Sequence, residues 1–435
     1  MSISLGLLYL LLILLPTQLG RHFFFPFSSI AGIRSDYLTP TVYLTDILIF
    51  LLISFSFLDK IKDLDQRPIS LWLKNSKISI GFLLSVICYL LFNVLFIAAN
   101  KGAAFYAFIK IVEYVLLGTI IVRVKPKMSA ICAIFAFAVL YVSGIAIGQF
   151  ALQRSIGGVF WFLGERTFYA STPGIAAISG GGRLFLRPYA TFPHPNVLGG
   201  FLAVVLPFIL FWFLKHYKEI NFFFKSFYIA SFSLGGVALF LSFSRSAWLV
   251  FFIGLSCLFF AAFPEFRAFN SGNGFFAKQK KEILLVCFYL LMLFSVVIPL
   301  SIPSQQESFV HRENLLQASI QAVLSQPLYG VGLNNSVVRL SSFLPRVLNF
   351  SFFQPVHNMY MLLFVETGFI GFTFFLLFFA LIFTRVLRAS PLIRIALLQL
   401  FFLGFFDHYL FTLQQGQLLF TLFAALAFSK DSLQA

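Results

Sequence analysis

Residues 301–355 read SIPSQQESFVHRENLLQASIQAVLSQPLYGVGLNNSVVRLSSFLPRVLNFSFFQP, and residues 356–372 continue as VHNMYMLLFVETGFIGF. The first stretch is polar and carries arginines, and it interrupts a chain that is otherwise apolar. The second stretch begins at a histidine and enters an apolar helix. What these residues do therefore depends on which side of a membrane they face.

The composition is that of a membrane protein. Hydrophobic residues make up 60% of the chain and charged residues 11%, with a mean hydropathy of +0.94, whereas soluble domains carry roughly 25% charged residues. We therefore predict an all-α fold, a polytopic bundle of membrane helices. The net charge of +16 lies in short loops between apolar spans, which favours membrane orientation over nucleic-acid binding. The four cysteines lie inside apolar runs, so we expect neither a disulfide framework nor a CxxC metal site.

About twelve stretches are long and apolar enough to cross the hydrocarbon core, which takes about 17 to 25 residues of helix. The first has no charged n-region and no small-residue cleavage site, so we expect a retained helix rather than a signal peptide. The predicted spans are 2–19, 40–58, 77–99, 102–123, 128–149, 196–215, 226–243, 246–263, 283–302, 358–383, 392–410 and 412–429.

The basic residues divide by type across the predicted membrane. With both termini in the cytoplasm, 19 of the 31 basic residues lie inside and 11 outside, and one lies within a span. Thirteen of the 19 are lysines, as expected of cytoplasmic loops, whereas 10 of the outer 11 are arginines. The arginine fork binds phosphate or carboxylate oxygens in pairs. We expect some outer arginines to bind an anion, while others lie at the interface for packing alone.

Two long outer segments, 150–195 and 302–357, hold enough polar residues to build a site. Residues 313–324 have helical periodicity and are compatible with an amphipathic helix on the membrane surface. The cytoplasmic connections have 18 residues or fewer, which is too short for a nucleotide-sugar-binding domain. The Asp63-Leu64-Asp65 triplet in one of them is interpreted as a solvated turn.

Arg187 begins the sequence RPYATFPHPN, which ends at Asn196. Pro193 and Pro195 predict an extended approach to a helix whose N-terminal amides face outward and attract an anion. Arg187 is then a phosphate ligand, or the Pro-His-Pro-Asn segment is simply a rigid cap. His194 is expected to be an interface residue rather than a base.

Arg245 and Arg312 are further outer arginines. Arg245 lies between two spans with almost no loop, so we expect its side chain to point into the protein. There it either binds a ligand or forms a structural ion pair, for which Glu366 is the candidate partner. Arg312 precedes the helical segment. Gly330 and Gly332 follow this segment, either in a tight turn whose backbone can approach a ligand closely or in an ordinary turn.

His357 opens the span that begins at 358, where a neutral imidazole can accept a proton from a hydroxyl near neutral pH. Glu366 lies nine residues further on, and on an ideal helix this places it on the opposite face, so it cannot orient His357. Lys110 and Glu113 have the spacing of a structural ion pair. Asp407, beside His408 at the end of a span, remains ambiguous.

The segments RPYATFPHPNVLGGFLA, FSRSAWL, HREN with PLYGVGLNN, and PVHNMYMLLFVETGFIGF occur in this order. Together they resemble the O-antigen ligase and Wzy polymerase superfamily of integral-membrane glycosyltransferases, over roughly residues 183 to 385. Ser246 replaces the glycine that usually follows the serine-arginine pair. The resemblance implies a GT-C-like enzyme of the bacterial cytoplasmic membrane. It implies transfer of a glycan from undecaprenyl pyrophosphate to a sugar, lipid or protein acceptor at the outer face.

The resemblance also implies roles for matched residues. Arg187 and Arg312 would hold the pyrophosphate, His357 would activate the acceptor hydroxyl, and Arg245 would support the site. We count His357 and Arg312 as catalytic. The candidate substrate-binding residues are Arg187, Arg245, Asn196, Asn358 and Glu366. Because few acidic residues lie in the outer loops, we predict catalysis without a metal or another cofactor.

The predicted organisation has four parts. Residues 1–150 hold the first five spans and 151–195 the first long outer loop; 183–385 form the ligase-like core, with the outer segment 302–357, and 386–435 the last two spans. The alternative function is a transporter or flippase of lipid-linked sugars, and a structural partner of an envelope complex is a third hypothesis.

Overall fold

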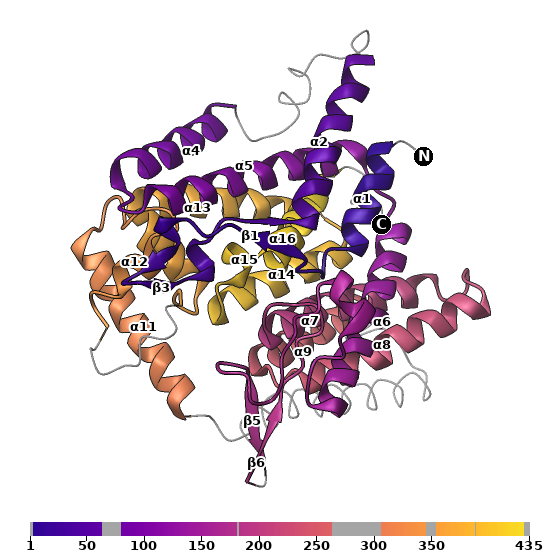
Figure 1. Ribbon diagram of the computed structural model, residues 1–435. Helices are drawn as coiled ribbons and strands as arrows, with labels where there is room; N and C mark the ends of the chain where they lie inside the picture. The colour runs from indigo at the N-terminus through magenta and orange to yellow at the C-terminus, as the bar shows by residue number, and fades with distance from the viewer. Residues whose placement is uncertain are drawn as a thin grey trace, which may run out of the picture.

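The computed structural model describes residues 3–62, 80–180, 182–262, 306–344, 354–387 and 389–429. Helices dominate the described chain, with three small two-stranded sheets beside them (Figure 1). The helices are α1 (Ile3–Ile13), α2 (Leu44–Lys62), α4 (Ile80–Phe92), α5 (Lys101–Val124), α6 (Met128–Leu152), α7 (Pro195–His216), α8 (Phe222–Leu241), α9 (Arg245–Ala262), α11 (Gln306–Ser325), α12 (Ser336–Leu340), α13 (Met359–Val386), α14 (Pro391–Phe406), α15 (Tyr409–Thr412) and α16 (Gln414–Phe428).

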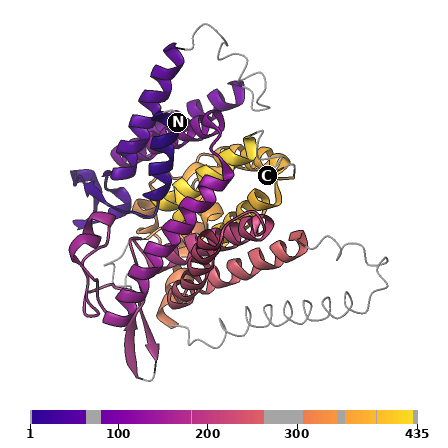
Figure 2. The same cartoon turned by 90° about the vertical axis from the view of Figure 1, so that its right-hand side faces the viewer.

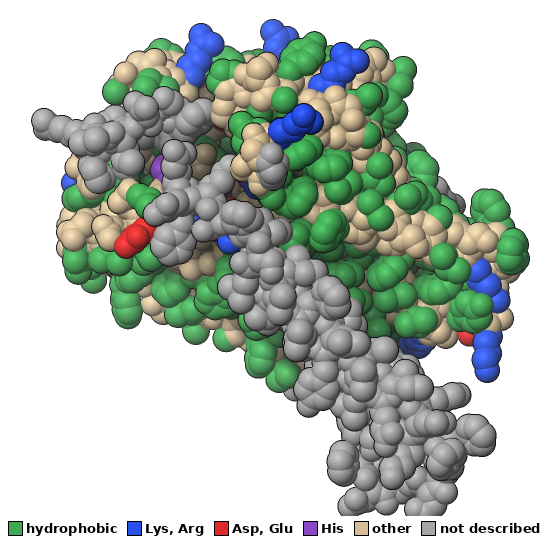
Figure 3. Space-filling model, turned by 90° about the horizontal axis from the view of Figure 1, so that it is seen from below, with side chains coloured by type: hydrophobic (Ala, Val, Ile, Leu, Met, Phe, Trp, Pro, Cys, Tyr) green, Lys and Arg blue, Asp and Glu red, His purple; other side chains and the backbone are tan. Residues whose placement is uncertain are grey.

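Within the described residues, five helices are long and apolar enough to cross a membrane: α5, α6, α7, α8 and α13. Five further apolar helices are shorter, and many large hydrophobic side chains are exposed. Figure 3 shows one such face, where hydrophobic side chains predominate and acidic ones are few. The protein is therefore an all-α, multi-pass membrane protein, as predicted. The predicted span at 283–302 lies outside the described residues, and the count of about twelve spans remains a prediction.

Helix α7 forms the centre of the bundle. Its apolar stretch is 78% buried, and it packs against α6, α8, α9 and α14. In two views at right angles, the C-terminal helices (yellow) lie between the N-terminal helices (indigo) and the α8–α9 pair (Figures 1 and 2). This arrangement brings the start of α7 close to the end of α14, and these two helix ends hold the site described below.

The short strands lie in two segments of the N-terminal half, residues 20–43 and 177–186. Strands β1 (Gly20–His22) and β4 (Thr41–Tyr43) pair with each other, as do β2 (Ser29–Ile30) and β3 (Ile33–Arg34). A hairpin of β5 (Ala177–Gly180) and β6 (Arg183–Leu186) projects from the bundle (Figure 1). The predicted first span is too long, because α1 ends at Ile13, before Pro16, and β1 already begins at Gly20.

Helix α13 is not the uninterrupted span that its apolar sequence predicts. Gly368 has φ +60° and breaks the helix. The backbone groups released there pair with the segment 327–332, because Val331 N–H donates to the Val365 carbonyl at 2.9 Å and Phe369 N–H donates to the Pro327 carbonyl at 2.8 Å. Broken helices at membrane depth require this type of internal satisfaction. The predicted glycine-rich turn is therefore the partner of the break in α13.

Helix α11 confirms the predicted helix around 313–324; one apolar face packs inside the protein, while Leu316, Ile320 and Leu324 are exposed. Leu315, Ala318 and Ala322 are buried in a cluster with Val331 and Val365. The face therefore packs against α13 and the segment before α12. This packing fixes α11, and with it Arg312, relative to the start of α13.

The predicted Lys110–Glu113 pair is present. The Lys110 ammonium lies 2.7 Å from Glu113 and also 2.7 Å from Asp46 of α2, so it joins two helices.

Candidate functional site

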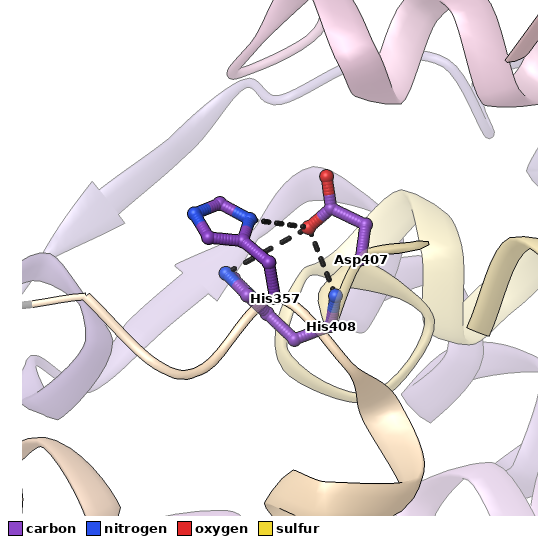
Figure 4. A group of neighbouring side chains, drawn as sticks. All are labelled: His357, Asp407 and His408. Carbon is purple, nitrogen blue, oxygen red and sulfur yellow. Dashed lines mark hydrogen bonds and ion pairs between the residues drawn. The ribbon is translucent and has the colours of Figure 1, made fainter. Parts of the chain in front are cut away.

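The centre of the site is a contact between the ends of two helices. His357 precedes α13, and Asp407 follows the last residue of α14. The Nδ1 atom of His357 lies 3.4 Å from Oδ1 of Asp407, and their side chains are 17% and 8% exposed. Figure 4 shows the His357 imidazole facing this carboxylate. The distance is that of an ion-pair contact, and catalytic hydrogen bonds are often long before substrate binds.

Asn358 brings these two helix ends together. As the N-cap of α13, its side-chain oxygen accepts from the Met361 amide at 2.9 Å, and its Nδ2 donates to the Phe405 carbonyl at 3.2 Å. Both ends of the amide are thus used within the protein. The structure therefore shows Asn358 joining the two helix ends beside His357, and its predicted contact with substrate remains a prediction.

His408 contacts the Asp407 carboxylate through both its backbone and its side chain. Its backbone N–H donates to Asp407 Oδ1 at 2.8 Å, and its Nε2 lies 3.8 Å from the same oxygen. The ring lies against the His357 ring, with centroids 5.3 Å apart, and its Nδ1 lies 2.6 Å from Thr412 Oγ1. Tyr37 of the N-terminal outer segment packs edge-on against it at 5.5 Å. His408 is therefore held on several sides.

Arg187 connects to this centre through Asn196. The Nη2 group of Arg187 donates to Asn196 Oδ1 at 2.7 Å, and its Nε donates to the Ser242 carbonyl at 2.8 Å. Asn196 Nδ2 in turn donates to Asp407 Oδ2 at 3.4 Å. Arg187, Asn196, Asp407 and His357 therefore form one continuous chain of polar contacts.

Three arginines are close enough to repel one another. Burial lowers the pKa of Arg187 to about 10, and the charges of Arg312 and Arg245 act in the same direction, while Tyr189 and Asp407 oppose them. Arg312 extends from α11, and Arg245 is the first residue of α9; both side chains are partly buried. A bound anion would relieve the repulsion of Arg187 by the other two arginines.

The Pro-His-Pro-Asn segment forms the start of α7, as the rigid-cap interpretation predicts. His194 is the N-cap of α7, and its Nδ1 accepts from the Asn196 amide at 3.1 Å. Burial, reinforced by the charge of Arg187, lowers the pKa of His194 to about 3. Such an imidazole is too weakly basic to remove a proton from a hydroxyl at neutral pH.

Two glycines place α7 against its neighbours. A Cβ on Gly199 would lie 2.8 Å from Ser242 Oγ, and a Cβ on Gly200 would overlap the Tyr409 hydroxyl. The Leu-Gly-Gly sequence after Asn196 therefore allows the start of α7 to approach both Ser242 and the 407–409 turn. This explains locally why Asn196 reaches Asp407.

Glu366 does not pair with an arginine among the described residues, which corrects that expectation. Its carboxylate accepts from the Asn334 amide at 2.8 Å and from the Ser336 hydroxyl at 2.7 Å. It thereby ties the segment before α12 to the broken helix α13. The structure thus gives Glu366 internal partners, and its predicted contact with substrate remains a prediction.

Asp407 and His408 are the residues of the site that sequence reasoning left without a role. The available signal was an adjacent acid and imidazole at the outer end of a predicted span, where ionisable groups are rare unless they have a partner. Histidine and carboxylate groups also occur in metal sites. Here the three arginines create a positive surrounding that disfavours a cation, and the absence of a metal remains a prediction.

One comparison with known proteins identifies a family for part of the chain. The family model described as O-antigen ligase matches residues 230–376, a range that includes Arg245, Arg312, His357 and Glu366. Arg187, Asn196 and Asp407 lie outside the matched range. No curated protein matches the chain significantly. The match, together with the apolar helices, supports the predicted membership of the O-antigen ligase and Wzy polymerase superfamily, over the matched third of the chain.

Proposed function

We propose that the protein transfers a glycan from undecaprenyl pyrophosphate to an acceptor hydroxyl at the outer face of the bacterial cytoplasmic membrane. The observation that carries this proposal is the His357–Asp407 contact, which lies near Arg187, itself within electrostatic range of Arg312 and Arg245. An imidazole base beside an anion-binding cluster is what this reaction requires.

The arginines would bind the diphosphate of the donor. Arg187 is already oriented by Asn196 and Ser242, so little side-chain freedom is lost when it binds. Arg312 and Arg245 add positive charge from two other helices. Arginine donors can bind diphosphate oxygens in pairs, and positive charge close to the leaving group stabilises the charge that develops there.

His357 would act as the general base. With Nδ1 toward Asp407, its Nε2 is available to accept the proton of the acceptor hydroxyl. The acceptor oxygen forms a bond to the anomeric carbon of the donor sugar as the bond from that carbon to the phosphate oxygen breaks. The electron pair leaves with undecaprenyl diphosphate, and the proton remains on His357 until it passes to solvent.

A genetic experiment tests this function. His357→Ala and Arg312→Ala, each expressed in the native host, should shorten or abolish the surface glycan. Arg339→Ala is the matched control, because this outer arginine is exposed and stacks on the Phe343 ring at 5.7 Å. The proposal is wrong if both site variants leave glycan length and abundance unchanged at normal expression. A transporter would instead move intact lipid-linked glycan across vesicles.

A further inference from the structure

We infer that Asn196 is a positioning residue which joins the anion-binding Arg187 to the Asp407–His357 pair, and not a ligand of the diphosphate. This inference rests on the proposed function. It replaces the simpler expectation that Asn196, at the start of a helix, contacts the substrate anion itself.

Both ends of the Asn196 amide are occupied within the protein. Its Oδ1 accepts from Arg187 Nη2 at 2.7 Å, and its Nδ2 donates to Asp407 Oδ2 at 3.4 Å. A side-chain amide both accepts and donates, whereas a carboxylate can only accept and an aliphatic side chain can do neither. The residue type therefore suits a position between a guanidinium and a carboxylate.

The connection orients Asp407. Asn196 holds its Oδ2, and the His408 backbone N–H holds its Oδ1 at 2.8 Å. With both oxygens held from separate elements, Oδ1 faces Nδ1 of His357. Fixing the carboxylate in this way fixes the imidazole tautomer, because the nitrogen facing Asp407 carries the proton and the other nitrogen is the base.

Asn196 also keeps the guanidinium of Arg187 apart from Asp407. Arg187 lies within electrostatic range of this carboxylate, since Asp407 acts to raise its pKa. Guanidinium and carboxylate groups prefer to pair directly through two parallel hydrogen bonds. Without Asn196, Arg187 would pair with Asp407, so that His357 would lose its partner and the diphosphate would lose a ligand.

Two substitutions should therefore move the titration of His357 in opposite directions. Asn196→Asp adds a negative charge beside Asp407, which favours the protonated imidazole and raises its pKa. Asn196→Ala lets Arg187 neutralise Asp407, and this loss of negative charge lowers the pKa of His357. The other titratable or charged groups around His357 are His408 beside Asp407, His311 and Arg312 of α11, and His194 and Arg187 before α7.

The test uses the purified full-length protein with uniformly ¹⁵N-labelled histidine, in which the His357 signal is assigned by its loss in His357→Gln. We expect the midpoint of the His357 titration to rise by about 0.5 to 1 pH unit in Asn196→Asp, and to fall by a similar amount in Asn196→Ala. Asn221→Asp is the matched control, because Asn221 caps α8 by accepting from the Phe224 amide at 3.0 Å, away from the site. It should leave the midpoint unchanged.

The second readout is the pH profile of transfer from an undecaprenyl-diphosphate-linked oligosaccharide. The acidic limb should follow the His357 midpoint, at higher pH in Asn196→Asp and at lower pH in Asn196→Ala. In Asn196→Asp kcat should fall more than the donor KM changes, whereas in Asn196→Ala, where Arg187 pairs with Asp407, kcat should fall and the donor KM should also rise. Coincident midpoints for wild type and both variants would overturn the role of Asn196. If one variant fails to fold, the shift in the other decides. Absence of transfer by the wild type, with shifted midpoints, would refute the proposed function and leave the polar connection intact.

Discussion

The backbone of Gly330 lies directly against the backbone of Gly368, and both glycines have positive φ, +71° and +60°. A Cβ on Gly330 would come within 2.5 Å of the Gly368 amide nitrogen. This contact is the point where the segment before α12 enters the break in α13. It orients the polar outer segment relative to the helix that begins beside His357.

Gly368→Ala should destabilise the protein. The backbone conformation alone costs an alanine about 1 to 3 kcal/mol, and its Cβ would overlap backbone atoms of Leu328 and Gly330. Thermal unfolding in detergent should show a lowered midpoint. Gly236→Ala in α8, where nothing lies within 4 Å of the added Cβ, is the control and should unfold at or above the wild-type temperature. Equal midpoints for Gly368→Ala and wild type would refute the account of the break.

Glu366→Ala should affect stability and leave the chemistry of the folded fraction intact. The substitution leaves the Asn334 amide and the Ser336 hydroxyl without their acceptor, and a buried unpaired group costs about 1 to 3 kcal/mol. The comparison is the rate per folded molecule, determined by size-exclusion chromatography and activity on the same sample. A hundredfold loss of this rate at wild-type stability would instead return Glu366 to the substrate site.

His357→Ala should have the opposite pattern. Loss of a general base lowers kcat by about 10² to 10⁴-fold, while unfolding should change little because the imidazole lies at a helix end and is partly exposed. Asp407→Asn should lower kcat by an intermediate factor. The asparagine can present its NH2 group to His357 Nδ1, and Nδ1 would then accept this hydrogen bond and leave the proton on Nε2, where the base should be. Unchanged kcat in both variants would exclude the pair from catalysis.

Arg187 should remain charged throughout the neutral range. Burial lowers its pKa to about 10, and a guanidinium is charged below its pKa. Its contribution to binding an anion should therefore be constant up to about pH 9 and decline as the pH rises through 10. Donor affinity measured against pH tests this, with Arg187→Lys as a variant that keeps a charge but loses the fork. Identical affinities at every pH for wild type and Arg187→Ala would remove Arg187 from the binding site.

Chelation should not change activity. Catalysis by arginines and an imidazole requires no divalent ion, so transfer in excess EDTA should proceed at the rate measured with added Mg²⁺. A loss in EDTA that Mg²⁺ or Mn²⁺ restores would contradict the predicted metal independence.

Candidate residues of the site could be selected from the sequence, but their connections could not. Asn196 and His357 could be selected because each lies where a predicted apolar span begins, and Arg187 because it begins the proline-rich segment that leads to one of these spans. The partner of His357 could not, because Asp407 lies fifty residues further along the chain, and only the packing of α13 against α14 brings them together. The internal partners of Glu366 were not predicted for the same reason, since they come from a turn that enters a broken helix.

The fold class also followed from composition, whereas the interruptions did not. Hydropathy averages over a window and cannot detect a single residue such as Gly368 that breaks α13. Likewise, hydropathy placed α14 and the beginning of α15 in one predicted span, 392–410. In the structure the helix is interrupted between them, at Asp407 and His408.

Release of undecaprenyl diphosphate tests the central claim most directly. Purified protein in liposomes, given an undecaprenyl-diphosphate-linked oligosaccharide as both donor and acceptor, should release undecaprenyl diphosphate as the glycan lengthens or is hydrolysed. His357→Ala should bind the donor with unchanged affinity and release the lipid diphosphate at least about 100-fold more slowly. Release at the wild-type rate by His357→Ala would contradict the account.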